Sequence, residues 1–159
     1  MSESERERSF NLFGGELERR ELAERPGYEW RSAKLGERLG GKLIGMSVYE
    51  LGPGQSTFPF HYHLLREEWV IVVSGRPTLR SADGDQVLET GDVAVFPAGE
   101  AGAHRLTNDG SEPARIAMFS NQPVGDAAVY PDSRKLGVMA AGERHLVRQD
   151  PPVDYWEGE

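Results

Sequence analysis

The 159-residue sequence contains no cysteine, which excludes disulfide bonds, a thiolate nucleophile and a thiolate zinc site. It also lacks a basic excess: 18 lysines and arginines stand against 26 acidic residues, and the net charge of −8 argues against binding nucleic-acid phosphates. No apolar segment approaches the roughly 18 residues of a membrane helix. The first residues, MSESERERSF, lack the apolar stretch of a secretory signal. We therefore expect a cytoplasmic protein that binds neither nucleic acid nor membranes.

Glycine and proline, by contrast, are plentiful, with 19 and 10 residues, and they are spread along the chain as turn signals. From about residue 31 these turns separate short segments rich in valine, isoleucine, threonine and aromatic residues. This rhythm is typical of an all-β sandwich or barrel. Asp83-Gly84 lies between two such segments and predicts a hairpin.

The chain divides into three predicted parts. Residues 1–30 form an N-terminal arm, mobile over about its first nine residues, with at most a short helix within residues 15–30. Residues 31–124 form the barrel, and the chain of 159 residues is long enough to bury a core without a metal or disulfide. Residues 125–159 form a tail packed on the barrel, and we expect apolar residues to hold it there: Tyr130, Leu136, Val138, Tyr155 and Trp156.

The stretch FPFHYHLLREEWVIVVSG, residues 58–75, holds two of the four histidines in the chain. If this histidine pair lies in a strand, His61 and His63 point to the same face, close enough to share one metal ion. In the next strand Glu68 shares a face with valines, whereas Glu67 points away, so Glu68 is the favoured carboxylate.

A third imidazole, His104, opens a later strand-like segment, AHRLTN. Three imidazoles and one carboxylate suit a first-row divalent metal such as Fe, Mn, Ni, Cu or Zn, and they leave open coordination positions. The alternative is that the paired histidines are ordinary surface or core residues, but the ordered spacing of all four groups argues against it. His145 has no such spacing and is expected on the surface.

The pair His61 and His63 lies in a motif that resembles one found in the cupin family. That motif is glycine, about five residues, His-x-His, three or four residues, glutamate, six residues and glycine. The matching positions are Gly54, His61, His63, Glu68 and Gly75. One residue more than usual separates Gly54 from His61.

A second cupin-like motif follows. In the family it is glycine, five residues, Pro-x-Gly, two residues, histidine, three residues and asparagine. The matching positions are Gly91, Pro97, Gly99, His104 and Asn108, with four residues instead of two before His104. The resemblance covers roughly residues 43–120. The EEW-x-x-V-x-x-GRPTLR stretch and the YPDS…DYWEGE ending are also similar to small single-domain bacterial cupins of unassigned biochemistry.

This resemblance implies an all-β fold, the double-stranded β-helix or cupin jelly-roll barrel, with a metal inside. It implies turn roles for the motif glycines and a hairpin-capping role for Asn108. The ligands that it implies are His61, His63, Glu68 and His104.

Two functions are expected for such a metal site. The first is a metal-dependent enzyme of the dioxygenase or isomerase type acting on a small organic molecule. The second is a non-catalytic, metal-dependent small-ligand binder or sensor; a purely structural barrel is disfavoured by the complete ligand set. No catalytic residue is assigned, and Tyr49, Tyr62 and Arg105 are expected to be structural more than substrate-binding.

The strand that follows Glu68 is apolar on both faces. Trp69, Ile71 and Val73 point away from the expected interior, so the tail or a second subunit must cover them. A homodimer is the prediction, with Tyr155 and Trp156 as the competing cover.

Overall fold

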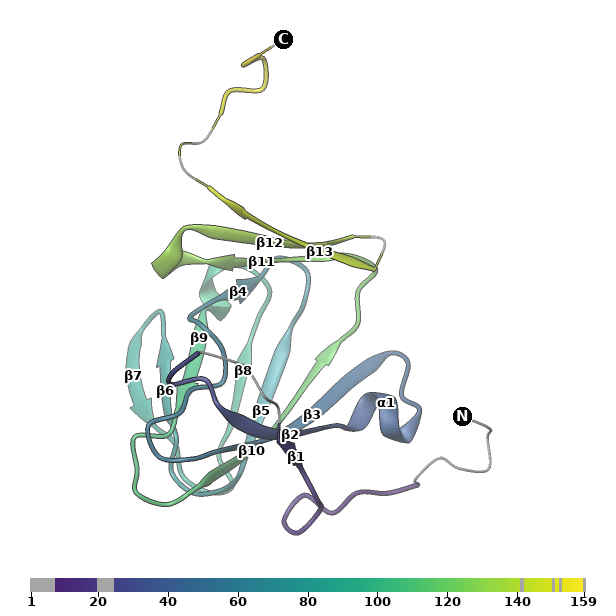
Figure 1. Ribbon diagram of the computed structural model, residues 1–159, viewed down its shortest axis with the longest axis vertical. Coiled ribbons are helices and arrows are strands. Elements are labelled where there is room, and N and C mark those ends of the chain that lie inside the picture. Colours follow the sequence, from purple (N-terminus) through teal and green to yellow (C-terminus); the bar gives the residue numbers. More distant parts are fainter. Residues whose placement is uncertain (1–7, 20–24, 141, 150, 152, 159) are drawn as a thin grey trace.

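The protein is described by a computed structural model that covers residues 8–19, 25–140, 142–149, 151 and 153–158 (Figure 1). It is built mainly of short β-strands, with one five-residue α-helix and short 3-10 turns in the described part. The predicted all-β class is confirmed. The elements are β1 (Glu18–Arg19), β2 (Trp30–Lys34), α1 (Leu35–Leu39), β3 (Ile44–Leu51), β4 (Tyr62–His63), β5 (Glu68–Ser74), β6 (Thr78–Ser81), β7 (Gly84–Val87), β8 (Val93–Phe96), η2 (Glu100–Gly102), β9 (His104–Thr107), β10 (Ala114–Asn121), β11 (Asp126–Tyr130), η3 (Pro131–Ser133), β12 (Lys135–Ala140) and β13 (Glu143–Arg148).

The strands form three antiparallel sheets that together make the jelly-roll barrel. One sheet has the order β1-β2-β3-β10-β5-β8, the second β13-β12-β11-β4 and the third β7-β6-β9. Figure 1 shows the second sheet lying across one end of the other two. The hairpin predicted at Asp83-Gly84 is confirmed, because β6 and β7 pair and close at Ser81 and Gly84.

Two apolar clusters form the core, one on each face of the largest sheet. Alternation along β5 sends Val70 and Val72 into the barrel and Val73 to the opposite face. The interior cluster contains Val70, Val72, Leu79, Leu88, Phe96, Leu106, Ile116 and Met118. The outer cluster contains Leu17, Ala33, Leu35, Val48, Val73 and Ala117, so the N-terminal segment and α1 cover this part of the sheet.

The N-terminal segment differs from the prediction. Glu18–Arg19 forms β1, which pairs with β2, and the described part of residues 15–30 contains no helix. Leu17, next to β1, packs in the outer cluster, and its carbonyl accepts a hydrogen bond from Arg31 Nη2 at 3.1 Å. Residues 20–24 and the segment 1–7, where mobility was predicted, lie outside the described residues.

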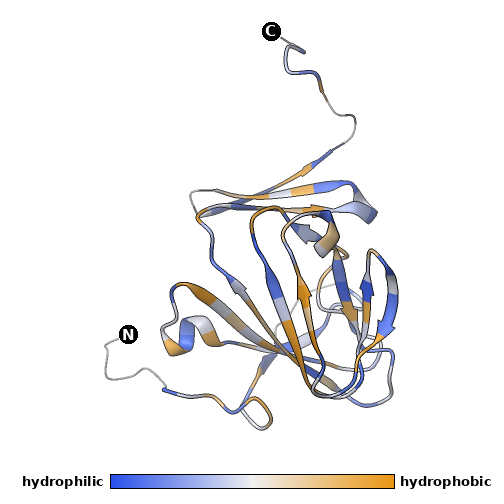
Figure 2. Ribbon diagram, turned by 180° about the vertical axis from the view of Figure 1, so that it is seen from behind, coloured by the Kyte–Doolittle hydropathy of each residue, from blue (hydrophilic) through white to orange (hydrophobic). Residues whose placement is uncertain are grey.

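The C-terminal segment also differs from a simple tail. It contributes three strands, and β11 pairs with β4, so this segment extends the sheet next to His63. Tyr130 is buried as predicted, but Tyr155 and Trp156 are 84% and 71% exposed, so their predicted docking on the barrel is wrong. Figure 1 and, from behind, Figure 2 show residues 153–158 away from the barrel, beyond β13. The division of the chain at residues 30 and 124 stays a prediction.

The motif glycines occupy turns that require them. Gly54, Gly75, Gly91 and Gly99 have φ of 73°, 82°, 95° and 93°, a region that side chains disfavour, which confirms their predicted turn role. At Gly75 a Cβ atom would also lie 2.7 Å from the Cα atom of Ala114.

Among the described residues, none of the helices has the length and apolar character needed to cross a membrane. The cytoplasmic location expected from the sequence stays a prediction.

Candidate metal centre

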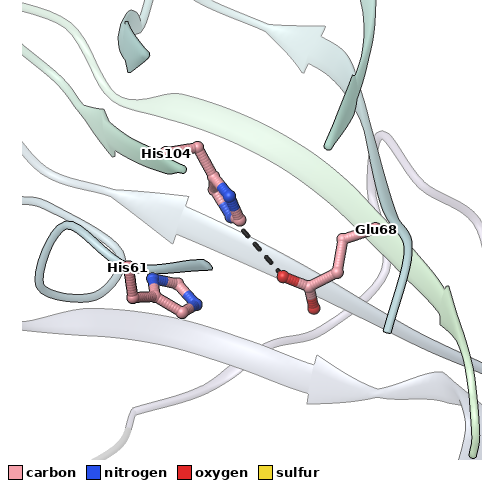
Figure 3. A group of neighbouring side chains, drawn as sticks. All are labelled: His61, Glu68 and His104. Carbon is pink, nitrogen blue, oxygen red and sulfur yellow. Dashed lines mark ion pairs between the residues drawn. The ribbon is translucent and has the colours of Figure 1, made fainter. Parts of the chain in front are cut away.

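The centre is organised by two backbone hydrogen bonds between the segments that carry His61 and His104. His61 N donates to His104 O at 3.2 Å, and His104 N donates to His61 O at 2.9 Å. This antiparallel bridge places the two ring centroids 4.8 Å apart. Glu68 enters from β5, in the six-stranded sheet, and Figure 3 shows its carboxylate directed toward the two rings.

His61, Glu68 and His104 form a group whose candidate ligand atoms all lie within 4.8 Å of one another. The two histidines are 5% and 1% exposed, and Glu68 Oε2 lies 3.5 Å from His104 Nε2. That nitrogen is buried and has no hydrogen-bond partner among the described residues. Buried polar atoms are normally satisfied, so the site offers a ligand atom in need of a partner.

The tautomers of these two histidines suit metal binding. The Nδ1 atoms of His61 and His104 lie 2.9 Å from the carbonyl oxygens of Pro59 and Gly102. A carbonyl only accepts, so each Nδ1 carries the proton, and in the neutral ring each Nε2 has a free lone pair. Imidazole ligands in metal sites are commonly held in this way.

His63 adjoins the group through Glu68 and is not one of its three members. Its Nε2 lies 3.4 Å from Glu68 Oε2, and its Nδ1 hydrogen-bonds Asp126 Oδ2 at 2.5 Å. Asp126 is buried on β11, and its other oxygen accepts a hydrogen bond from Leu65 N at 3.2 Å. The ring centroids of His61 and His63 are 5.1 Å apart, so all four predicted ligands lie in one neighbourhood.

Aromatic packing holds the histidine rings in place. Phe96 stacks on His104 with centroids 3.7 Å apart and planes within 6°. Tyr130 lies nearly parallel to His61 at 5.7 Å. Rings confined in this way lose little further side-chain freedom when they bind a ligand.

The electrostatics favour neutral His61 and His104 beside an ionised Glu68. Burial, together with the neighbouring His104 and His63, lowers the pKa of His61 to about 4. Burial also lowers the pKa of His104. Burial alone would raise the pKa of Glu68, but the hydrogen bond with His63 and the nearby histidines lower it to about 2. These are the protonation states that metal ligands require.

His63 behaves differently. Burial lowers its pKa, but the hydrogen bonds and charges of Glu68 and Asp126 outweigh burial and raise the pKa above its ordinary value. Protonation therefore competes with a metal at Nε2 more strongly at His63 than at His61 or His104.

The remaining sequence candidates lie apart from the centre. The Glu67 carboxylate accepts a hydrogen bond from Trp69 Nε1 at 2.8 Å and thus points away from the histidines. His145 is exposed on β13, 3.5 Å from Glu143. Asn108 braces a turn, because its Nδ2 donates to Leu51 O and Glu112 O at 2.9 and 2.8 Å.

Two residues of the centre were missed from the sequence, Asp126 and Tyr130. Both lie in the segment where the strand pattern fades, beyond the second motif. Only the pairing of β11 with β4, which sets Val129 opposite Tyr62, brings them beside the histidines. No local signal in the sequence indicates that pairing.

A cavity of about 320 Å³ opens beside the centre. Glu68 belongs both to the candidate metal centre and to the cavity lining. Tyr49 and Phe58 contribute aromatic walls to the cavity. Tyr62 and Arg105, the other two sequence candidates, are not among the lining residues. The cavity is of the size that holds a small molecule.

A β-barrel with a buried cluster of histidines and a glutamate defines a class, the jelly-roll proteins with a candidate metal centre. The particular family follows from residues 47–120, which match the family model for the cupin domain. Residues 47–120 therefore form a cupin domain, as the two motifs predicted.

Two solved structures resemble most of the chain. One is a candidate sugar phosphate isomerase from Acidithiobacillus ferrooxidans, with 28% identity, a TM-score of 0.79, and coverage of 87% of this chain and 88% of that one. The other is a sugar phosphate isomerase of the cupin superfamily from Silicibacter pomeroyi, with 27% identity, a TM-score of 0.78, and coverage of 92% and 97%.

A predicted oxalate decarboxylase from Thermotoga maritima has the same fold, with a TM-score of 0.56 and 21% identity. The match covers 68% of this chain and 95% of that one. No curated protein matches the sequence.

Asp126 provides a test of how the centre is built. Asp126→Ala removes the acceptor of His63 Nδ1, and we expect the affinity for Zn²⁺ to fall about 10–100-fold, the usual effect of losing such a partner. Asp126→Asn keeps an acceptor and should lose less. The measurement is a competitive titration with a zinc indicator.

The matched control is Asp132→Ala, which removes an exposed carboxylate bonded to Arg80 at 2.6 Å. It should leave the affinity unchanged. Equal affinities for Asp126→Ala and the unsubstituted protein, with both folded by circular dichroism, would contradict a positioning role for Asp126.

Proposed function

We propose that this protein is a metal-dependent isomerase acting on a small sugar or sugar phosphate. Its ligands would be His61, His63, Glu68 and His104, binding one divalent ion of Fe, Mn, Ni, Cu or Zn. The observation that carries the proposal is the buried Nε2 of His104, which faces Glu68 without a hydrogen-bond partner in the described structure. The two structures at 27% and 28% identity support the isomerase class over the dioxygenase class.

When bound, such a metal supplies Lewis-acid polarisation of a carbonyl or hydroxyl oxygen. The residues of this chain have their own tasks. Glu68 provides the negative charge, since its pKa lies far below neutrality. His61 and His104 provide lone pairs in a fixed direction because Pro59 and Gly102 hold their Nδ1 protons.

The surroundings of the centre suit a small organic substrate. Val70 and Phe96 lie in the apolar interior cluster, which keeps bulk water away from the inner side of the site. The cavity that meets Glu68 gives a substrate access from the other side. Water exclusion strengthens electrostatic interactions with a bound oxygen.

Metal binding is tested by paired substitutions. We expect His61→Ala and Glu68→Ala to lose most of the bound metal. The metal content of protein purified without chelators is measured by inductively coupled plasma mass spectrometry. The controls are His145→Ala and Glu67→Ala, which remove the same groups outside the centre. Chelation should also lower the melting temperature, since a ligand of the native state alone stabilises it.

Equal metal loss from Glu67→Ala and Glu68→Ala would contradict the assignment. An unchanged melting temperature after verified metal removal would argue against tight binding.

Activity is tested by interconversion of aldose and ketose phosphates, followed by proton NMR in deuterated water. The metal-loaded protein should isomerise at least one member of a panel of triose to hexose phosphates, and His61→Ala should not. A protein that holds metal and binds members of the panel without converting any would favour the alternative, a non-catalytic metal-dependent binder or sensor.

We also propose a homodimer. The N-terminal segment covers Val73, but another part of that face is open: Trp69, Val93 and Val95 are exposed. Register places Trp69 beside Val95 and Phe119, and Ile71 beside Val93, so these residues form one apolar patch over β10, β5 and β8. Tyr155 and Trp156 are exposed and do not cover this patch. A second copy of the chain can cover it through two-fold pairing.

Light scattering at low micromolar concentration tests the dimer. The expected mass is twice the 17.6 kDa of one chain, and Val95→Lys should reduce it to one chain by placing a charge in the patch. Val153→Lys, at an exposed site outside the patch, is the control. A mass of 17.6 kDa for the unsubstituted protein would contradict the proposal.

A further inference from the structure

The cavity beside Glu68 is lined by three cationic side chains as well as by the carboxylates of Glu37 and Glu68. Its lining includes Arg66, Lys34 and Lys42, in a chain whose net charge is −8. Lys34 Nζ is paired with Glu37 at 3.3 Å, and Lys42 is exposed. Arg66 is the most enclosed of the three, with a side chain that is 26% exposed.

Arg66 is held in place without being satisfied. Its Nε lies 3.5 Å from Asp126 Oδ2, within an ion pair, yet that nitrogen is buried and makes no hydrogen bond with any residue the structure describes. The two oxygens of Asp126 already accept hydrogen bonds from His63 Nδ1 and Leu65 N. Leaving this buried N–H without an acceptor costs free energy, and the guanidinium carries further N–H donors on its two Nη nitrogens.

The chemistry of a guanidinium on a cavity wall points to an oxyanion as its ligand. Arginine binds phosphate and carboxylate groups in a planar, two-pronged geometry, and these charge-assisted hydrogen bonds are strong. Ser47 and Ser120 line the same cavity and add hydroxyl groups of the kind that also bind phosphate oxygens. Glu68 marks the metal side of the cavity, so an anion at Arg66 would leave the rest of a small molecule beside the centre.

We propose that Arg66, assisted by Lys42, forms a phosphate subsite that binds the phosphate monoester of the substrate. The inference deepens the proposed function, on which it rests for the sugar part of the ligand. Arg66 thereby selects phosphorylated sugars over free sugars. Its link to Asp126, which bonds His63, keeps the guanidinium at a defined place relative to the centre.

Isothermal titration calorimetry tests the subsite with inorganic phosphate, glucose 6-phosphate and glucose, on the purified full-length protein before and after chelation. Glucose 6-phosphate should bind at least about 10-fold more tightly than glucose, as one charge-assisted contact predicts. Arg66→Gln should weaken both phosphate ligands by about 10-fold or more, also after chelation. Arg66→Lys should retain part of the affinity, and Lys42→Gln should show a smaller loss.

Arg148→Gln is the matched control, because it removes an exposed arginine on β13 that does not line the cavity. It should bind phosphate like the unsubstituted protein. Metal content is measured for every variant. Retained phosphate affinity in Arg66→Gln overturns the subsite, and so does a phosphate loss that follows only from metal loss, since Arg66 would then act through Asp126 and His63.

The two proposals fail in distinguishable ways. Phosphate binding that depends on Arg66, without isomerisation of any sugar phosphate, refutes the isomerase and leaves the subsite. Isomerisation that Arg66→Gln leaves unchanged, together with unchanged phosphate affinity, refutes the subsite and leaves the isomerase.

Discussion

The backbone bridge between His61 and His104 is the contact on which the centre depends. Its two hydrogen bonds join the segment before β4 to the start of β9, and a second bridge joins Ser56 to Thr107 along the same seam. These bridges close the barrel wall at the site where two of the candidate ligands lie. The barrel therefore brings the histidines together through its backbone, and the side chains need only the correct tautomer, which Pro59 and Gly102 set.

A second layer of support comes from a distant part of the chain. Asp126 and Tyr130 on β11 contact His63 and His61, while Arg66 pairs with Asp126 from the cavity side. The C-terminal strands are thus part of the site as well as of the fold. The same carboxylate connects the orientation of one candidate ligand with the position of the cavity's most enclosed cation. A change at Asp126 is expected to affect both.

The barrel was predictable from the sequence because strand alternation and turn signals are local features. The set of four ligands stays a prediction, and the structure groups His61, Glu68 and His104 within 4.8 Å of one another. Alternation places His61 and His63 together and separates Glu68 from Glu67, and the glycines at positive φ occur at the turns. Features that depend on long-range pairing were not predictable in this way. The pairing of β11 with β4 brings in Asp126, and β1 pairs with β2 in the segment where at most a short helix was expected. The cover over Val73 came from the N-terminal segment for the same reason, whereas Tyr155 and Trp156, chosen for their size, are exposed.

The central claim is that His61, His63, Glu68 and His104 bind one metal ion. X-ray absorption spectroscopy of the zinc-loaded protein tests it most directly, because the outer-shell scattering counts imidazole ligands. The account predicts three imidazoles and additional oxygen ligands at roughly 2.0–2.2 Å. A spectrum with two imidazoles would remove His63 from the ligand set, and one with two or fewer would contradict the four-ligand claim.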